Sequence, residues 1–212
     1  HCELTPLEKA TAQRYRFNDD DVKKIFSNID IIKTNQRTKK PRKYAKEYEL
    51  IIRIAMYSGA RESEIISLTI SDIIEEPESK IKYFRFIVES EEESIKNYNS
   101  WRFVPIHHHL EPYIMNYINS FDKRRKCLFT ITPKQFGKDF SKFKKSLEFG
   151  KNQVFHSFRH SVANKLKNQA KDIEVSQEIT GHAKNTTFNR YAKSYDVVNK
   201  KGVLDKIFYK LD

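Results

Sequence analysis

Four basic residues stand next to breaks in the expected secondary structure: Arg61, His156, Arg159 and His182. Arg61 and His182 each follow a glycine closely, and His156 and Arg159 are three residues apart. On a helix this spacing puts two side chains on one face, and the backbone dipole adds positive character near the helix N-terminus. A group of cations arranged in this way suits an anion.

Each of these residues also has a plain structural explanation when it is taken alone. Arg61 could pair with Glu64 on its own helix, and His156 could cap the N-terminus of a helix. Motifs of a single residue match by chance often. The argument for chemistry therefore depends on the order and spacing of the whole set.

That order resembles the tyrosine recombinases of the phage integrase family, over residues 17–195. Residues 58–65, Ser-Gly-Ala-Arg-Glu-Ser-Glu-Ile, are similar to the family's first arginine box, Gly-x-Arg-x-x-Glu-Leu. Residues 154–163, Val-Phe-His-Ser-Phe-Arg-His-Ser-Val-Ala, resemble its second box, His-x-x-Arg-His followed by small and apolar residues. The second segment is the more specific of the two.

The resemblance also selects a nucleophile. Residues 180–182, Thr-Gly-His, are similar to the family's Leu-Gly-His element, with threonine in place of leucine. The nucleophilic tyrosine of the family follows that histidine by nine positions, which selects Tyr191 from the 11 tyrosines of this chain. Tyr195 lies four residues later on the same helical face and is the rival nucleophile.

A catalytic lysine is expected between the two arginine boxes. The family carries it on a β-hairpin that precedes a Val-Pro pair, and Lys96 precedes Val104 and Pro105 in this chain. An acidic cluster that suits phosphate poorly stands just before it, at Glu89, Glu91, Glu92 and Glu93. Lys96 is the candidate that the pattern supports least.

The resemblance implies that the cations stabilise a transition state at phosphorus. Attack of a phenol oxygen on a phosphodiester puts charge on the non-bridging oxygens, and this charge calls for fixed positive donors. Arg61 and Arg159 would bind these oxygens as bidentate forks, and His182 would donate to one of them. These residues take the part that Mg²⁺ plays in other phosphoryl-transfer enzymes, so we expect no metal and no cofactor.

The same resemblance implies the proton transfers. Tyr191 has a reference pKa of about 10 and needs help to ionise, which His156 would give. Lys96 would protonate the departing 5′-hydroxyl as the general acid. The product is a 3′-phosphotyrosyl link that keeps the energy of the phosphoester, so no ATP is required. Glu64 either holds Arg61 in its rotamer or forms an ordinary pair on the helix surface.

The net charge favours an extended polyanion as the partner. Lys and Arg number 40 against 28 Asp and Glu, which leaves a formal charge of +12. An AT-rich genome, which encodes many lysines, is the plainer explanation of this excess. With the resemblance, we expect the partner to be double-stranded DNA, bound by a monomeric free domain that forms a homotetramer on synapsed sites.

Other features limit the possible classes. Cys2 and Cys127 are far apart and form no CxxC motif, which excludes a disulfide framework and a zinc site of that kind. His107, His108 and His109 have no further ligand at useful spacing and are expected on the surface. No apolar run reaches the ~20 residues of a membrane span. We expect a cytoplasmic protein encoded by a bacterium or a phage.

Apolar residues at spacings of three and four predict most of the secondary structure. Helices are expected at 22–29, 44–58, 62–68, 110–121, 136–147, 158–166 and 174–180, with a further helix to residue 195 and an amphipathic tail. Residues 83–88 and 101–106 are rich in aromatic and β-branched side chains and predict two antiparallel strands. Glycines at 59 and 181 are expected to end the helices before them.

These elements predict a mainly α-helical α+β domain with a small antiparallel sheet near residues 70–106, the fold of a tyrosine recombinase catalytic domain. Residues 1–15 would be a linker or a remnant of a missing N-terminal core-binding domain. Residues 16–196 would form the catalytic domain. Residues 197–212 would be a tail that either completes this core or docks on a neighbouring subunit.

Two other functions fit part of the pattern. A type IB topoisomerase uses similar cations and a tyrosine but relaxes supercoils without pairing DNA sites, and the nine-residue step from His182 to Tyr191 favours the recombinase. A DNA-binding relative that has lost catalysis is the other alternative. The complete set of reactive residues argues against it.

Overall fold

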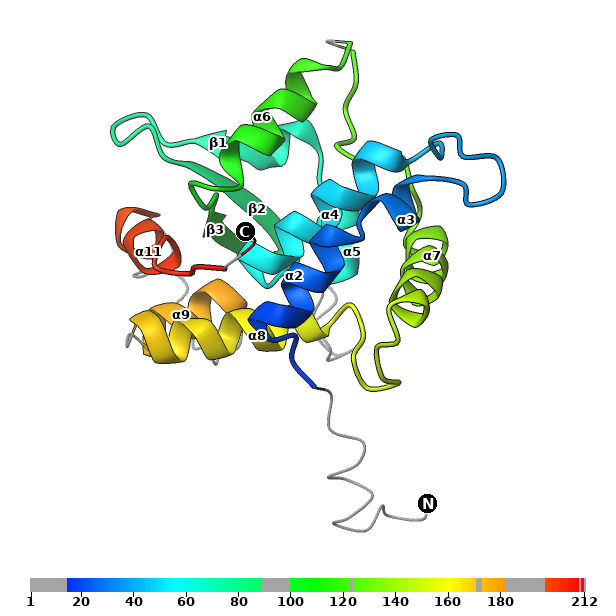
Figure 1. The fold of residues 1–212 in the computed structure, drawn as a ribbon. Coiled ribbons are helices and arrows are strands. Elements are labelled where there is room, and N and C mark those ends of the chain that lie inside the picture. The colour runs from blue at the N-terminus through cyan, green and yellow to red at the C-terminus, as the bar shows by residue number, and fades with distance from the viewer. Residues whose placement is uncertain are drawn as a thin grey trace, which may run out of the picture.

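The computed structural model of the chain describes residues 15–88, 100–122, 124–170, 173–181, 197–209 and 211. In this part, helices surround a small antiparallel sheet, with α6 at the top of Figure 1 and α8 and α9 at the bottom. The predicted fold class is confirmed. The predicted helix that ends at Tyr195 lies outside the described residues.

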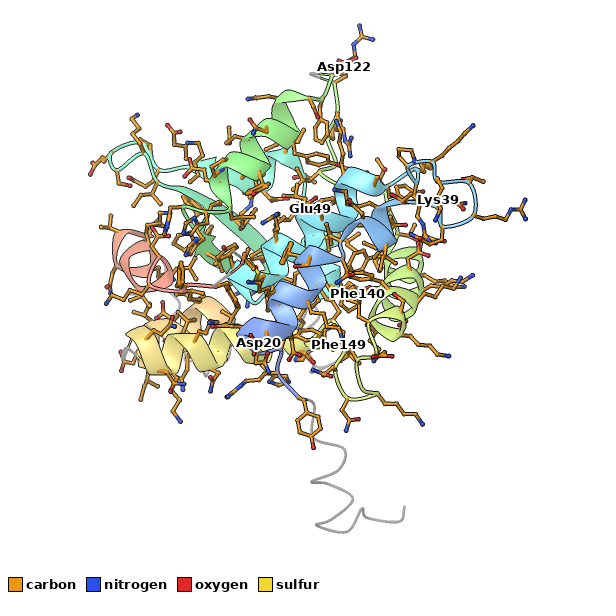
Figure 2. The ribbon with its side chains drawn as sticks, in the orientation of Figure 1. Asp20, Lys39, Glu49, Asp122, Phe140 and Phe149 are labelled. Atoms are coloured by element: carbon orange, nitrogen blue, oxygen red, sulfur yellow. The ribbon has the colours of Figure 1, made fainter. Side chains whose placement is uncertain are left out.

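The N-terminal helices form as their local sequence predicts. α2 (Asp19–Ser27) begins at Asn18, whose side chain accepts a hydrogen bond from the backbone N–H of Asp21 at 2.8 Å, while the Asp21 carboxylate accepts one from the Asn18 N–H at 2.9 Å. This reciprocal pair satisfies two N–H groups that helix geometry leaves without partners. After the short α3 (Asp30–Lys33), a loop rich in lysine and arginine runs to residue 44 and includes Lys39 (Figure 2).

The central helix is α4 (Ala45–Ser58), which is buried on nearly all sides and packs against α3, α5, α6 and α8. It ends at Gly59, whose φ of 63° lies in the left-handed region that glycine adopts without strain. α5 (Glu62–Ile66) follows after two residues. The turn between α4 and α5 is therefore fixed at both ends.

The sheet has three antiparallel strands in the order β1 (Ile73–Glu75), β2 (Lys82–Val88) and β3 (Ser100–Pro105), and a single 3₁₀ turn, η1 (Ile70–Asp72), leads into it. Phe84 pairs with Val104, and Phe86 pairs with Arg102. The first three of these side chains are fully buried, so this face of the sheet covers the core. Arg102 lies on the same face.

The other predicted helices are present with ends shifted by a few residues: α6 (Glu111–Asn119), α7 (Pro133–Ser146), α8 (Ser157–Lys165) and α9 (Ile173–Thr180). A π-helical turn, η2 (Leu166–Ala170), follows α8. Phe140 on α7 (Figure 2) meets Phe155 and Phe158 edge to face or tilted, with ring centroids 5.3 and 6.3 Å apart. These aromatic contacts join α7 to the start of α8.

The C-terminal segment packs on its own chain. α11 (Val197–Leu204) lies against β3, and Leu204 and Ile207 are buried. The Tyr209 hydroxyl donates to the Met56 carbonyl of α4 at 2.9 Å, and the Lys165 ammonium donates to the Phe208 carbonyl at 2.8 Å. Docking on a neighbouring subunit and the proposed domain limits stay predictions. Within the described ranges, no helix is long and apolar enough to cross a membrane.

Candidate active site

The turn after α4 joins the two segments that carry the predicted arginines. The Ser58 hydroxyl donates to the Ile54 carbonyl at 2.6 Å and accepts from the Ala60 N–H at 3.1 Å, which holds the chain in the turn. The Gly59 carbonyl accepts a hydrogen bond from Nη1 of Arg159 at 3.0 Å. A Cβ on Gly59 would lie 3.2 Å from the Val162 side chain, so α8 approaches this turn closely.

Arg61 and Glu64 form a reciprocal contact at the start of α5. The Arg61 N–H donates to Oε2 of Glu64 at 2.7 Å, and Nη1 of Arg61 donates to Oε1 at 3.1 Å. The Glu64 residue is only 5% exposed, whereas the Arg61 side chain is 35% exposed. The alternative of an ordinary surface pair is therefore wrong, because the carboxylate of this pair is buried.

A third arginine, which the sequence reasoning missed, completes the contacts of Glu64. Nη2 of Arg102 on β3 donates to Oε2 of Glu64 at 2.7 Å, and the Arg102 guanidinium lies 5.2 Å from the ring centroid of Phe86. Arg102 is 6% exposed. The signal was the alternation of the strand, because a strand that turns Val104 inward also turns Arg102 inward. An inward arginine requires a buried acceptor.

Arg159 lies in the first turn of α8 and is 2% exposed. Burial lowers its pKa to about 10, and the charges of Arg102 and Arg61 contribute to this lowering. Burial also lowers the pKa of Arg102, where Glu64 opposes the shift and Arg61 adds to it. Arginine side chains keep their positive charge in proteins, so both groups are cations. Arg61 and Arg102 therefore share the Glu64 carboxylate, and Arg159 lies near enough to feel its charge.

Gly181 ends α9 next to two of these cations. Its φ is 68°, and a Cβ at this position would lie 2.8 Å from Nη1 of Arg102 and 3.5 Å from Nη2 of Arg159. Among the residues that the structure describes, neither of these buried nitrogens has a hydrogen-bond partner, and the same is true of Nε of Arg102. The turn that leads to residue 182 thus begins beside buried, unsatisfied N–H groups.

The other predicted site residues are placed in part. His156 occupies the N-cap position of α8, three residues before Arg159, and its ring centroid lies 5.0 Å from that of His160. Its side chain makes no capping hydrogen bond. Lys96, His182 and Tyr191 lie outside the described residues. The structure thus brings Arg61, Glu64 and Arg159 together, and the assignment of the complete catalytic set stays a prediction.

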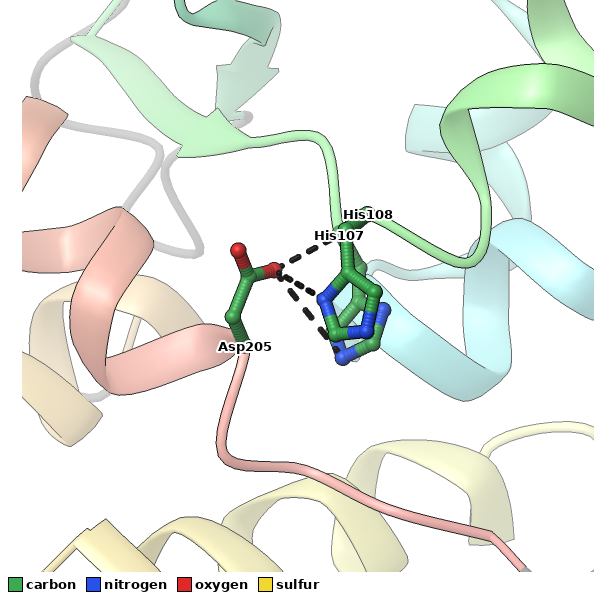
Figure 3. Close-up of side chains that lie close together, drawn as sticks. All are labelled: His107, His108 and Asp205. Carbon is green, nitrogen blue, oxygen red and sulfur yellow. Dashed lines mark hydrogen bonds and ion pairs between the residues drawn. The ribbon is translucent and has the colours of Figure 1, made fainter.

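A group with metal-ligand chemistry lies elsewhere, where the tail meets the end of β3. Nδ1 of His108 is 3.2 Å and Nε2 of His107 is 4.0 Å from Oδ1 of Asp205 (Figure 3). However, Nε2 of His107 is 2.9 Å from the Ile207 carbonyl, and its Nδ1 accepts from the His109 N–H at 3.1 Å. Both ring nitrogens of His107 are therefore engaged, so this histidine has no free lone pair to offer a metal.

His107 is fully buried, and the prediction of a surface position was wrong for this residue. Its ring stacks on Tyr57 with centroids 4.3 Å apart, while its bond to the Ile207 carbonyl joins the sheet to the tail. Burial lowers its pKa to about 4, so the ring is neutral. The histidine therefore serves the packing of the tail.

Solved structures with a similar fold are recombinases and integrases. The integrase from mycobacterium phage Brujita is 13% identical with a TM-score of 0.64, and the match covers 98% of this chain and 60% of that one. XerH recombinase bound to difH in a pre-cleavage complex is 20% identical with a TM-score of 0.60, at 84% and 50% coverage. XerA recombinase is 17% identical with a TM-score of 0.56, at 91% and 63% coverage.

The fold is therefore that of the catalytic domain of tyrosine recombinases, and this chain spans between half and two thirds of the length of these three proteins. No curated protein sequence matches it significantly. The sequence model of the phage integrase family matches residues 15–197, in agreement with the fold. The chain belongs to the phage integrase family, as its motifs predicted.

Proposed function

We propose that this chain is the catalytic domain of a site-specific recombinase that integrates or excises DNA by cutting and rejoining it without a metal or ATP. One observation supports this function above the others. Arg61 and Arg159, which are 98 positions apart in the sequence, meet around Gly59 and Glu64 with an excess of buried positive charge. Unsatisfied N–H groups on buried arginines favour an anion such as a DNA phosphate.

In the proposed reaction, Arg61 and Arg159 bind the non-bridging oxygens of the scissile phosphate. His156 accepts the phenolic proton of Tyr191, whose oxygen then attacks phosphorus. The bond from phosphorus to the 5′-oxygen breaks, and Lys96 gives a proton to this leaving oxygen. His182 donates to a non-bridging oxygen and orients the phosphate.

Rejoining is the reverse of this sequence, with a 5′-hydroxyl of the same or a partner strand as the nucleophile. Each step exchanges one phosphoester for another, so the reaction needs no external energy. A homotetramer on two synapsed duplexes would supply the four tyrosines that exchange of both strands requires, and the free domain would be a monomer. The XerH structures, solved in pre- and post-cleavage complexes with difH substrates, are consistent with such a cycle for that protein.

The test is capture of the covalent intermediate with three proteins, namely the parent chain, Tyr191→Phe and Tyr195→Phe. DNA binding is first measured at low salt, because phosphate contacts weaken steeply as salt rises. Each protein is then incubated with a library of nicked random duplexes and denatured, and protein-linked DNA is sequenced. Each phenylalanine variant differs from the parent by a single hydroxyl, and the two variants control for each other.

We expect adducts from the parent and from Tyr195→Phe and none from Tyr191→Phe, and the attached sequences then define the target site. If adducts persist in Tyr191→Phe and vanish in Tyr195→Phe, the nucleophile is Tyr195. DNA binding by the parent without any adduct would contradict the proposed enzyme and favour a DNA-binding relative that has lost catalysis.

A further inference from the structure

We propose that Arg102 is a positioning residue of this active site, which orients Arg61 toward the phosphate by holding the Glu64 carboxylate between them. The inference rests on the proposed function, because it gives a role to a residue that the reaction above does not use. Arg102 lies on β3, 41 positions from Arg61 in the sequence, and the described contacts join the two arginines through Glu64.

The burial of Arg102 carries the first step of the argument. Transferring a guanidinium from water to a protein interior costs several kcal/mol, and a single ion pair offsets this cost only in part. Arg102 forms one described ion pair, with Glu64, while Nε and Nη1 have no described partner. An apolar side chain of similar length would fill the same space without this cost. The structure therefore retains a costly charge whose described ion pair is with the carboxylate of Glu64.

The division of the Glu64 oxygens carries the second step. Oε2 accepts from the Arg61 backbone N–H and from Nη2 of Arg102, each at 2.7 Å, and Oε1 accepts from Nη1 of Arg61 at 3.1 Å. Arg102 thus helps to fix the rotation of the carboxylate, and the described bond from the Arg61 guanidinium to Glu64 comes from Nη1. Without Arg102, the Glu64 carboxylate can rotate and accept two hydrogen bonds from the Arg61 guanidinium. This pairing would turn the guanidinium away from the phosphate.

The position of Gly181 carries the third step. Nη1 of Arg102 faces the end of α9, at the point that Nη2 of Arg159 also faces. Arg102 therefore lies between Glu64 of the first box and the turn that precedes His182. A side chain in this place sets the distance between the first arginine box and the turn after α9, and the proposed reaction needs these two segments at a fixed relative position.

The experiment compares Arg102→Met and Arg102→Lys with a matched control, Arg85→Met. Arg85 is also a sheet arginine in a carboxylate pair, because Nε and Nη2 donate to Oδ1 of Asp72 at 3.0 and 2.8 Å. For each variant we would measure the free energy of unfolding in urea, the dissociation constant for nicked DNA, and the single-turnover rate of adduct formation at saturating DNA.

We expect Arg102→Met to slow adduct formation by about 10²-fold, the usual effect of losing one group that stabilises a transition state, with a dissociation constant within about threefold of the parent. Arg102→Lys should recover part of the rate, because it keeps the charge but has one donor in place of a fork. Arg85→Met should leave the rate within about threefold. Combining Arg102→Met with Glu64→Gln should slow the reaction no further than one of the two changes alone, because both act on one contact.

A rate for folded Arg102→Met within about threefold of the parent would overturn the proposal. If Arg102→Met does not fold, Arg102→Lys decides, and a parental rate for that variant overturns it equally. A second readout is independent of activity: NMR of the arginine guanidinium protons should show rotation of Arg61 restricted in the parent and faster in Arg102→Lys. A parent without adducts but with this NMR difference would contradict the proposed function and leave the positioning intact.

Discussion

A Cβ atom on Gly181 would lie 2.8 Å from Nη1 of Arg102, closer than a real Cβ contact allows. The φ of 68° at the same residue lies in the left-handed region, which disfavours other residues. Two independent constraints thus favour glycine where α9 ends. The family motif has its glycine at this position, and the structure supplies a physical reason for it.

Gly181→Ala is therefore expected to lower the free energy of unfolding by about 1–2 kcal/mol, since alanine at positive φ costs about 1 kcal/mol and the guanidinium must also move. Gly202→Ala is the control, because it lies inside α11 with no heavy atom within 4 Å of a Cβ. It should stabilise the protein by roughly 0.5–1 kcal/mol. Urea unfolding measures both changes. Equal effects of the two substitutions would contradict the steric argument.

Glu64→Gln should be one of the most destabilising single changes in this domain. It removes the carboxylate that compensates Arg61 and Arg102, and loss of one partner from a buried ion pair costs about 3–5 kcal/mol. The control is Glu75→Gln, which removes a pair with Lys82 in which the Glu75 side chain is 46% exposed, and it should cost less than about 1 kcal/mol. Urea unfolding at neutral pH gives both values. A loss below about 1 kcal/mol for Glu64→Gln would show that its charge is not needed.

Arg159→Lys separates charge from geometry at the second box. Lysine keeps the positive charge but has no fork, so it cannot bond the Gly59 carbonyl and an anion in the way that a guanidinium can. We expect the rate of adduct formation to fall by about 10²-fold or more, with a smaller change in DNA affinity. Single-turnover assays at saturating DNA test this expectation. An unchanged rate would mean that Arg159 acts only through its charge.

His107 should make the stability of the domain depend on pH. Its pKa is lowered to about 4 in the folded protein by burial, with Asp205 opposing the shift and His108 adding to it. The unfolded chain has the ordinary value of about 6.5 and so binds the proton first as the pH falls. The free energy of unfolding should therefore drop between pH 6.5 and about 4, by at most ~1.4 kcal/mol per pH unit, and this contribution becomes constant below.

The control is His107→Gln, whose amide can still donate to the Ile207 carbonyl but does not titrate. Urea unfolding of both proteins at several pH values between 7 and 4 measures the difference between their slopes. Because the comparison uses slopes, a constant loss of stability in the variant does not affect it. Identical slopes in the two proteins would exclude His107 as the source.

The helices and the two main strands could be predicted because their signals are local. Spacings of three and four between apolar residues marked α4 and α7, and Gly59 and Gly181 marked helix ends with positive φ. The short strand β1 had no signal of its own. It exists because Ile73 and Ile74 pair with β2, which is a tertiary contact.

The site could be predicted only as a set of residues. The sequence pointed to Arg61, Glu64 and Arg159, but the number of cations that share Glu64 depends on the register of the sheet. Arg102 lies in a segment whose aromatic and β-branched residues predict a strand, and the face that its side chain occupies depends on the register of that strand. In the same way, Asp205 reaches His107 and His108 only because the tail folds back over β3.

The contacts that the C-terminal tail makes with its own domain limit how tails can be exchanged between copies of the protein. Each domain has one place for Ile207 and Tyr209, and in this chain its own tail fills that place. A copy that lends its tail to a neighbour must receive another one, because otherwise His107 and Tyr57 lose their cover. An exchange of tails is complete in a closed ring of copies. In an open row, one domain always lacks a bound tail and one tail has no domain to bind.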